Sequence, residues 1–268
     1  MTNYILENRA VIAGIKRACE KYGIRYSAFS DEWIIRLTLG DARQFVLGYN
    51  FDCNGQASAA IARDKAATHD LLKENGVASM RHELLSTPDS PLPNKRLVDE
   101  MIKRHESIVI KPVLGSRGEN VARFWSADDA MRYMESSNIP SWAIAPYEAI
   151  VSETRLIVLD GVVSIAYEKT NPREIGGLKM YNLHLGADAK KLSISDLDAD
   201  MVAIARAAMD AIGLRLGAVD IIKTAEGEMS VIEINSGFSL EHYVKQSAEY
   251  REEVELFYEN LTCRLFNF

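Results

Sequence analysis

Glu233 and Asn235 stand two residues apart in an apolar run near the C-terminal end of the chain. On a strand both side chains leave the same face, because successive side chains alternate in direction. Asp220 lies in the preceding apolar run, and the turn at Glu226-Gly227 predicts a hairpin that brings the three side chains together. Three oxygen ligands suit Mg²⁺, which keeps waters and substrate phosphates as its remaining partners. A polar hairpin edge is the alternative, but a carboxylate in so apolar a run is costly to bury without a partner, so we predict a metal site.

Two lysines and a glycine-rich loop form a candidate phosphate-binding set. Lys111 ends a short apolar strand, and the loop follows it closely. The loop contains Gly115, Ser116, Arg117 and Gly118. Glycines let backbone N–H groups turn toward an anion, and a lysine at the strand end adds a positive charge for the same anion. Lys65 opens a predicted helix earlier in the chain. Taken alone, the loop is typical of a plain turn, and each lysine is typical of a surface charge. Together the three features indicate a phosphate site.

Composition restricts the class of protein. The chain has 268 residues, 47% of them hydrophobic, which is enough for one large domain or two modest ones. Its net charge of -7 argues against a nucleic-acid partner. The three cysteines, Cys19, Cys53 and Cys263, show no metal-binding spacing and fit a reducing compartment. No apolar run approaches the ~20 residues that cross a bilayer, and the N-terminus lacks a signal-peptide pattern, so we predict a cytoplasmic protein without a membrane partner.

Hydrophobic periodicity predicts a mixture of hairpins and helices, which is the α+β class. Helices are predicted at 4–22, 58–75, 95–105, 127–137, 195–212 and about 240–262, and strands at 24–29, 33–39, 44–51, 107–111, 120–124 and 141–146. Two further strands meet at Asp160-Gly161. With the short run 83–85 as a first strand, the middle of the chain has a β-α-β-β-α-β order, a split, ferredoxin-like pattern. We interpret the Pro-rich segment 86–93 as a hinge or loop, and 170–190 as a long loop.

The order of these motifs resembles that of the ATP-grasp superfamily over about residues 58 to 240. A lysine before a helix, a strand with Lys-Pro and a glycine loop, and then Asp…Glu-x-Asn follow the family's order. The chain is most similar in style to the carboxylate–amine ligases: glutathione synthetase, cyanophycin synthetase and D-alanine–D-alanine ligase. The resemblance implies an ATP-grasp fold with a reduced N-terminal α/β region at 1–62, a small lid subdomain at 63–148, and a large C-terminal subdomain with the metal site at 149–268.

The resemblance also implies how the phosphates of ATP are bound. Lys65 and Lys111 would hold the α- and β-phosphates, and the loop 115–118 would close over the β- and γ-phosphates. The three predicted metal ligands would carry two Mg²⁺ ions, for which Mn²⁺ can substitute.

A further segment, 145–150, looks like the family's hinge, whose backbone pairs with adenine. This likeness assigns Tyr147 and Ile150 to the nucleotide. Glu148 or Glu153 would contact adenine or ribose, and the choice between them stays open.

The chemistry implied by the family is a two-step ligation. A substrate carboxylate attacks the γ-phosphate to give an acyl phosphate and ADP, and the amine of an amino acid or peptide then displaces phosphate. Phosphoryl transfer needs neutralised charge and positioning more than covalent help from the protein. The implied catalytic residues are Lys111, Arg155, Asn182 and His184. Arg155 would meet the γ-phosphate or acyl phosphate, with a surface arginine as the alternative, whereas Asn182 and His184 belong to a segment similar to Asn-x-His-x-Gly. A kinase that phosphorylates a small molecule and a non-catalytic nucleotide-binding protein are the alternative functions.

Only about 60 residues precede Lys65, fewer than ATP-grasp ligases usually have. The acceptor pocket would then be open to a bulky or peptide substrate, or a second subunit of a homodimer would complete it. In the second case the aromatic residues Phe29, Trp33 and Tyr49 would serve the interface, although such residues in strands are more often core. We interpret Glu241 as part of the first turn of the last helix, where a carboxylate suits the helix dipole.

Overall fold

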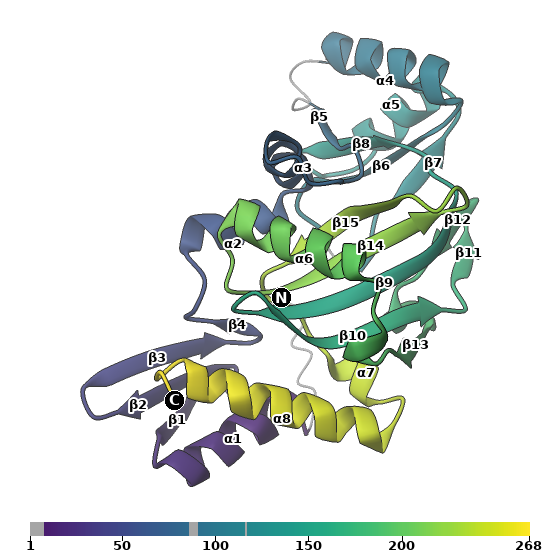
Figure 1. Ribbon diagram of the computed structural model, residues 1–268. Coiled ribbons are helices and arrows are strands. Elements are labelled where there is room, and N and C mark those ends of the chain that lie inside the picture. Colours follow the sequence, from purple (N-terminus) through teal and green to yellow (C-terminus); the bar gives the residue numbers. More distant parts are fainter. Residues whose placement is uncertain (1–7, 86–90, 116) are drawn as a thin grey trace.

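The computed structural model describes residues 8–85, 91–115 and 117–268, and these form three parts. Figure 1 shows the parts stacked from top to bottom: a small sheet with two helices, a large sheet of long strands, and a third sheet beside two packed helices. Three clusters of buried apolar side chains form the cores of these parts: one lies within the small sheet and its helices, one between the large sheet and the third part, and one between the large sheet and the helices on its other face. The predicted α+β class is confirmed.

The large sheet consists of β9 (Ile150–Leu159), β10 (Val162–Thr170), β13 (Asp188–Lys191), β14 (Leu216–Thr224) and β15 (Met229–Asn235). Its order is β13-β10-β9-β14-β15, and neighbouring strands are antiparallel. Both predicted hairpins are confirmed, because β9 joins β10 at Asp160-Gly161 and β14 joins β15 through Glu226-Gly227. Side chains of β9 alternate between two cores. Leu156 packs with helix α6 (Ala199–Ile212), whereas Ile157 packs with the third part.

The small sheet consists of β5 (Glu83–Leu85), β6 (Ile108–Pro112), β7 (Ala122–Phe124) and β8 (Trp142–Pro146), with helices α4 (Pro91–His105) and α5 (Ala127–Glu135). Its order is β5-β8-β6-β7, so β8 is inserted between β5 and β6. The predicted β-α-β-β-α-β order and its split character are therefore confirmed. The Pro-rich segment 86–93 lies partly outside the described residues, and the rest of it, 91–93, begins α4 rather than a loop.

The third part joins the two ends of the described chain. Helix α1 (Ala10–Tyr22) packs against α8 (Ala248–Arg264) beside a sheet of four strands, β1 (Arg25–Phe29), β2 (Ile34–Leu39), β3 (Ala42–Leu47) and β4 (Asn50–Phe51). Gly14 permits close contact between the helices, because a Cβ there would collide with the Glu255 carbonyl oxygen and the Tyr258 side chain. The helix predicted at 4–22 begins at Ala10, with 4–7 outside the described residues. The single final helix is wrong, because α7 (Glu241–Val244) and α8 are separate.

Two other expectations from the sequence are wrong. The helix predicted at 58–75 is two helices, α2 (Gln56–Arg63) and α3 (Lys65–Glu74). Asp64 has an extended backbone, and its side chain caps α3 by accepting hydrogen bonds from the N–H groups of Ala66 and Ala67. The segment 170–190 is not a loop, since it contains β11 (Arg173–Ile175), β12 (Leu178–Met180) and the 3₁₀ turn η1 (Leu183–Leu185). Gly176-Gly177, with φ of 58° and 74°, makes the tight turn between β11 and β12.

A short segment connects α3 to the edge of the large sheet. The Met80 N–H donates to the Val231 carbonyl oxygen at 2.8 Å, and the Val231 N–H donates to the Ala78 carbonyl oxygen at 3.0 Å. Helix α3 also packs against α6, so its position follows the large sheet. The subdomain boundaries after residues 62 and 148 stay predictions. In the part of the chain that the structure describes, no helix combines the length and the apolar character needed to cross a membrane.

Candidate active site

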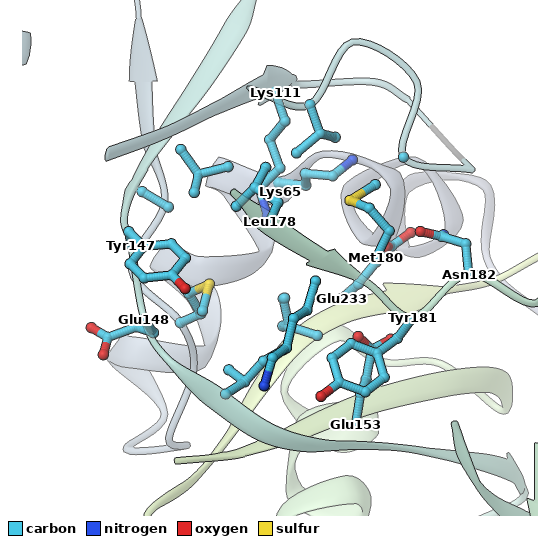
Figure 2. Close-up of a pocket in the computed structure, with 18 of the residues that line it drawn as sticks. Lys65, Lys111, Tyr147, Glu148, Glu153, Leu178, Met180, Tyr181, Asn182 and Glu233 are labelled. Carbon is cyan, nitrogen blue, oxygen red and sulfur yellow. The ribbon is translucent and has the colours of Figure 1, made fainter. Parts of the chain in front are cut away.

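Lys65 and Lys111 come from different elements and meet at one cavity. Lys111 lies near the end of β6 and is only 7% exposed. Lys65 is the first residue of α3, and an isolated β-bridge between Asp64 and Leu114 ties this helix start to the loop after β6. The Lys65 Nζ donates a hydrogen bond to the Gly115 carbonyl oxygen at 3.1 Å. Figure 2 shows the two lysine side chains next to each other.

Burial and neighbouring charge change the acidity of Lys111. Burial first, and the Lys65 ammonium second, disfavour the charged form and lower the pKa of Lys111 to about 8. Glu233 and Glu153 act in the opposite direction. Burial and the charge of Lys111 also lower the pKa of His82 well below its ordinary value. A polyphosphate held by both ammonium groups would offset their mutual repulsion.

A cavity of about 190 Å³, here called the smaller cavity, is lined by residues of both sheets. Its lining includes both lysines, Glu233 of β15, and the crossover 147–149 between β8 and β9. The Tyr147 N–H donates to the Ser107 carbonyl oxygen at 3.1 Å, and the Arg123 guanidinium lies 3.3 Å from the centre of the Tyr147 ring. These contacts fix the crossover at one wall of the cavity (Figure 2).

The two glutamates that the sequence left as alternatives have different environments. Glu148 is exposed in the crossover, beside Tyr147 (Figure 2). Glu153 lies on β9, and its side chain is 13% exposed and paired with Lys169. Burial raises the pKa of Glu153, and Lys169 only partly offsets this effect. Both glutamates line the smaller cavity.

A row of charged side chains crosses the large sheet. Arg155 of β9, Asp220 of β14 and Glu233 of β15 are direct cross-strand neighbours. Arg155 binds Asp220 through two hydrogen bonds, from Nε to Oδ1 at 2.7 Å and from Nη2 to Oδ2 at 2.6 Å. Lys169 Nζ lies 3.2 Å from Asp220 Oδ2. The alternative of a surface arginine is wrong, because the Arg155 side chain is only 18% exposed.

The charges of this row stabilise one another. Burial opposes the ionisation of Asp220, but Arg155 and Lys169 outweigh it and lower the pKa of Asp220. Burial likewise opposes the charge of Lys169, but Asp220 and Glu153 outweigh it and raise its pKa. Two cations and two carboxylates therefore form one buried network. Lys169 was not identified from the sequence. Lys169 lies two residues after Tyr167 on β10, so both side chains leave the same face of the hairpin, and this spacing could have placed Lys169 beside the residues of β9.

The predicted metal ligands Asp220, Glu233 and Asn235 lie on the β14–β15 hairpin and line one groove. The Glu233 side chain makes no hydrogen bond or ion pair within the described residues, so its carboxylate oxygens are available to a ligand. Asp220 differs, because both of its oxygens already accept hydrogen bonds from Arg155. No group of three or more His, Cys, Asp or Glu residues in the described ranges is placed to hold a metal. The donor chemistry fits a divalent ion at Glu233 and Asn235 that completes its shell with phosphate and water oxygens.

The glycine loop approaches the segment after β12. Gly118 has a φ of 69°, and a Cβ there would collide with the Met180 side chain and lie 3.0 Å from Asn182 Oδ1. Arg117 and Asn182 line both the smaller cavity and a second cavity next to it. Ser116, predicted in the same loop, lies outside the described residues. Gly118 of the loop therefore lies against the segment around Asn182.

The second cavity, here called the larger groove, has a volume of about 1390 Å³. It begins at Asp220, Glu233 and Asn235 and reaches α1 and the N-terminal sheet at its far end. His184 of η1 and His242 of α7 line it with their ring centroids 6.1 Å apart. Burial first, and neighbouring cations second, lower the pKa of both imidazoles. The predicted catalytic residues Asn182 and His184 thus lie in this groove, while Lys111 lines the smaller cavity.

Solved structures with this architecture are ATP-grasp enzymes. D-cycloserine synthetase aligns with a TM-score of 0.61 and 25% identity, over 77% of this chain and 71% of that one. The D-alanine–D-alanine ligase of Bacillus anthracis, complexed with ATP, aligns with a TM-score of 0.59 and 17% identity, over 79% and 69% of the two chains. The architecture is the ATP-grasp fold, as predicted.

The sequence gives a narrower placement. The model of the RimK-like ATP-grasp domain matches residues 62–250, and the chain belongs to this family. A protein of Serratia proteamaculans named probable alpha-L-glutamate ligase is 30% identical over 74% of this chain. One of Psychromonas ingrahamii with the same name is 27% identical over 75% of this chain. The chain spans 64% of the length of both relatives. The resemblance to the ATP-grasp superfamily is confirmed.

Proposed function

We propose that this protein is an ATP-dependent ligase that activates a carboxylate as an acyl phosphate and joins it to an amine, releasing ADP and phosphate. The observation that carries the proposal is that Lys65, Lys111 and Glu233 line the same cavity, with Asn235 in the adjoining groove. Cations for a polyphosphate and oxygen ligands for its metal ion are then adjacent, as phosphoryl transfer requires. The relatives named as glutamate ligases favour an amino-acid or peptide substrate.

The two lysines would bind the α- and β-phosphates, and the loop from Gly115 to Gly118 would cover the β- and γ-phosphates. Support comes from the hydrogen bond of Lys65 to Gly115, which already links one ammonium to the loop. The Lys65 ammonium disfavours the charge on Lys111, and an anion bound by both lysines would offset this repulsion. Closure of the loop would keep water away from the acyl phosphate.

The crossover between the sheets would hold the nucleoside, with backbone groups of Tyr147 and Ile150 facing adenine. Of the two glutamates we assign Glu148 to this contact, because it is exposed at the crossover. Glu153 is already paired with Lys169 inside the sheet. Breaking that buried pair to reach a nucleoside would be costly.

Glu233 and Asn235 would hold Mg²⁺, which when bound neutralises phosphate charge; two ions, and replacement by Mn²⁺, belong to the proposal. Arg155 uses Nε and Nη2 to hold Asp220, and its Nη1 remains for the transferred phosphate. Asn182 and His184 would line the acceptor side, since both face the larger groove.

The test is a screen for ATP turnover over pairs of amino acids and short peptides, with mass spectrometry of the products. ADP, inorganic phosphate and an amide in equal amounts are the expected products. A stable phosphorylated compound without an amide would replace the ligase by a kinase. Failure to bind or turn over ATP with every pair would leave a non-catalytic protein.

We further propose a cytoplasmic location and a homodimer. All three cysteines are free, which suits a reducing compartment. On the N-terminal sheet Phe29, Phe45 and Leu47 are 46%, 46% and 51% exposed, and a second copy would cover such side chains. Light scattering across a concentration series measures the mass; a monomer at all concentrations would contradict the dimer.

A further inference from the structure

Arg9 precedes α1 and lines the far end of the larger groove. It is only 7% exposed. Its Nη2 donates to the Glu32 carbonyl oxygen at 2.6 Å, but its Nη1 is buried and has no partner among the residues that the structure describes. An unpaired donor on a buried cation costs free energy, so an acceptor supplied by a ligand would be stabilising.

Two other cations of the groove have carboxylate partners. Lys16 Nζ lies 2.7 Å from Glu32 Oε1, and Arg155 is held by Asp220. Arg9 forms no ion pair with a carboxylate in the described ranges; its one hydrogen bond goes to a neutral carbonyl. Asp31 and Glu32 line the same groove, so what Arg9 lacks among the described residues is an acceptor for its Nη1, not a nearby negative charge.

The Arg9 guanidinium is also held in place. Its central carbon lies 5.6 Å from the centre of the Trp33 ring and 6.0 Å from that of Tyr49. Aromatic faces at this distance stabilise and orient a guanidinium. Such an arrangement lowers the side-chain entropy that Arg9 would lose on binding a ligand.

Glu241 connects this cation to the rest of the site. Its carboxylate accepts hydrogen bonds from the Ala10 N–H at 3.1 and 3.3 Å, so it caps α1 directly after Arg9. Glu241 does lie in the first turn of a helix, as predicted, although that helix is α7 and not the last one; its carboxylate in addition caps α1. Because the chain runs from Asn235 to Glu241 in six residues, α1 is held at a fixed place relative to β15.

We propose that Arg9 binds a free carboxylate of the substrate, at the opposite end of the larger groove from the carboxylate that is activated. The inference rests on the proposed ligase function and names its substrate class: an amino acid or short peptide with a second carboxylate that is not consumed. The volume of about 1390 Å³ exceeds the ~300–1000 Å³ of usual small-molecule sites, so the groove has room for an elongated substrate. A guanidinium can bind a carboxylate with two parallel hydrogen bonds, which a lysine cannot.

The test measures binding by calorimetry of two free acids, each with more than one carboxylate, and of their C-terminal amides: L-glutamate and L-glutamyl-L-glutamate. At least one free acid should bind the unmodified protein about tenfold or more tightly than its amide. Arg9→Met should bind acid and amide equally, and Arg9→Lys should keep part of the preference. Lys21→Met is the matched control, because Lys21 is an exposed cation on the same helix that pairs with Glu259. This control should keep the full preference.

Binding of a non-hydrolysable ATP analogue separates the two proposals. The affinity for this analogue should be unchanged in Arg9→Met. Failure of the unmodified protein to bind the analogue would overturn the ligase proposal itself. With nucleotide binding intact, equal affinities for acid and amide, or no binding of any free acid, would overturn the role of Arg9. If Arg9→Met fails to fold, Arg9→Lys is compared with the unmodified protein instead. A preference of Arg9→Lys for acid over amide as large as that of the unmodified protein would contradict the contact through two hydrogen bonds.

Discussion

Arg155 holds Asp220 through two hydrogen bonds of 2.7 and 2.6 Å inside the large sheet, where Asp220 is only 2% exposed. Lys169 approaches the same carboxylate to 3.2 Å. A residue that the sequence predicts as a metal ligand is therefore also the countercharge of two cations. Its contribution to folding can be measured independently of any nucleotide.

Replacing Asp220 by Asn should lower the free energy of unfolding by about 3–5 kcal/mol, because Arg155 stays buried without its countercharge and Lys169 keeps only Glu153. The folded-state pKa of Asp220 is lowered, so its stabilisation is present above the unfolded-state value of about 3.9 and is lost as pH falls through the folded value. Denaturant unfolding at pH 7 measures the full effect. Asp160→Asn, which weakens surface pairs with Arg215 and Arg264, should cost at most about 1 kcal/mol. Equal losses in the two variants would contradict the role of the buried pair.

Glu233→Gln should reduce ATP turnover by about a hundredfold or more while leaving the melting temperature within a few degrees, because an amide is a weaker ligand for Mg²⁺ than a carboxylate. Phosphate release at saturating ATP and Mg²⁺ measures the loss. Glu228→Gln is the matched control, an exposed glutamate at the start of the same strand region, and it should retain full turnover. Full turnover in Glu233→Gln would remove the metal role of this residue.

The pKa of Lys111, lowered to about 8, predicts that nucleotide binding depends on pH. Below pH 8 the ammonium is charged and attracts phosphate, and above it the charge is lost. The affinity for ATP should therefore fall about tenfold between pH 7 and pH 9. Calorimetric titration at several pH values measures this fall. Lys111→Met should bind ATP more weakly at pH 7 and show a flat profile; a profile as steep as that of the unmodified protein would assign the titration to another group.

Gly118→Ala should impair nucleotide binding and turnover by about tenfold or more, because the new methyl group meets the Met180 side chain and the backbone has a positive φ. Gly161→Ala carries the same backbone strain at a φ of 73° with nothing within 4 Å, in a turn away from both cavities. It should cost about 1 kcal/mol of stability and leave turnover unchanged. Kinetics and melting curves of the pair distinguish crowding at the loop from strain alone. Equal kinetics would show that close approach to Met180 is unimportant.

Local patterns in the sequence were sufficient for the hairpins and for placing Asp220, Glu233 and Asn235 on one of them. The alternation around Glu233 and the turn at Glu226-Gly227 each depend on neighbouring residues only. The break at Asp64 was missed, because the residues on both sides favour a helix and the capping bonds are visible only in the structure. The β11–β12 hairpin was missed because its strands are three residues long.

Contacts between distant parts of the chain could not be predicted. Arg155 and Asp220 are 65 residues apart in the chain, and their pairing depends on the register of β9 and β14. The bond between Ala10 and Glu241 joins residues 231 apart, and no sequence pattern marks either of them. Arg9 was therefore invisible as a candidate, since its chemistry depends on what the fold leaves unpaired around it.

Lys65 is fixed to the large sheet through α3, whereas Lys111 belongs to the small one. A polyphosphate held by both would act as a further strut between two bodies that are already joined by the crossover at 147–149, by the chain from α3 to β5 and by the bridge between Asp64 and Leu114. Binding of the nucleotide should then restrict the motion of the two sheets relative to each other. A pair of fluorescent labels, one on α4 and one on α6, would register the arrival of ATP as a narrowing of their distance distribution.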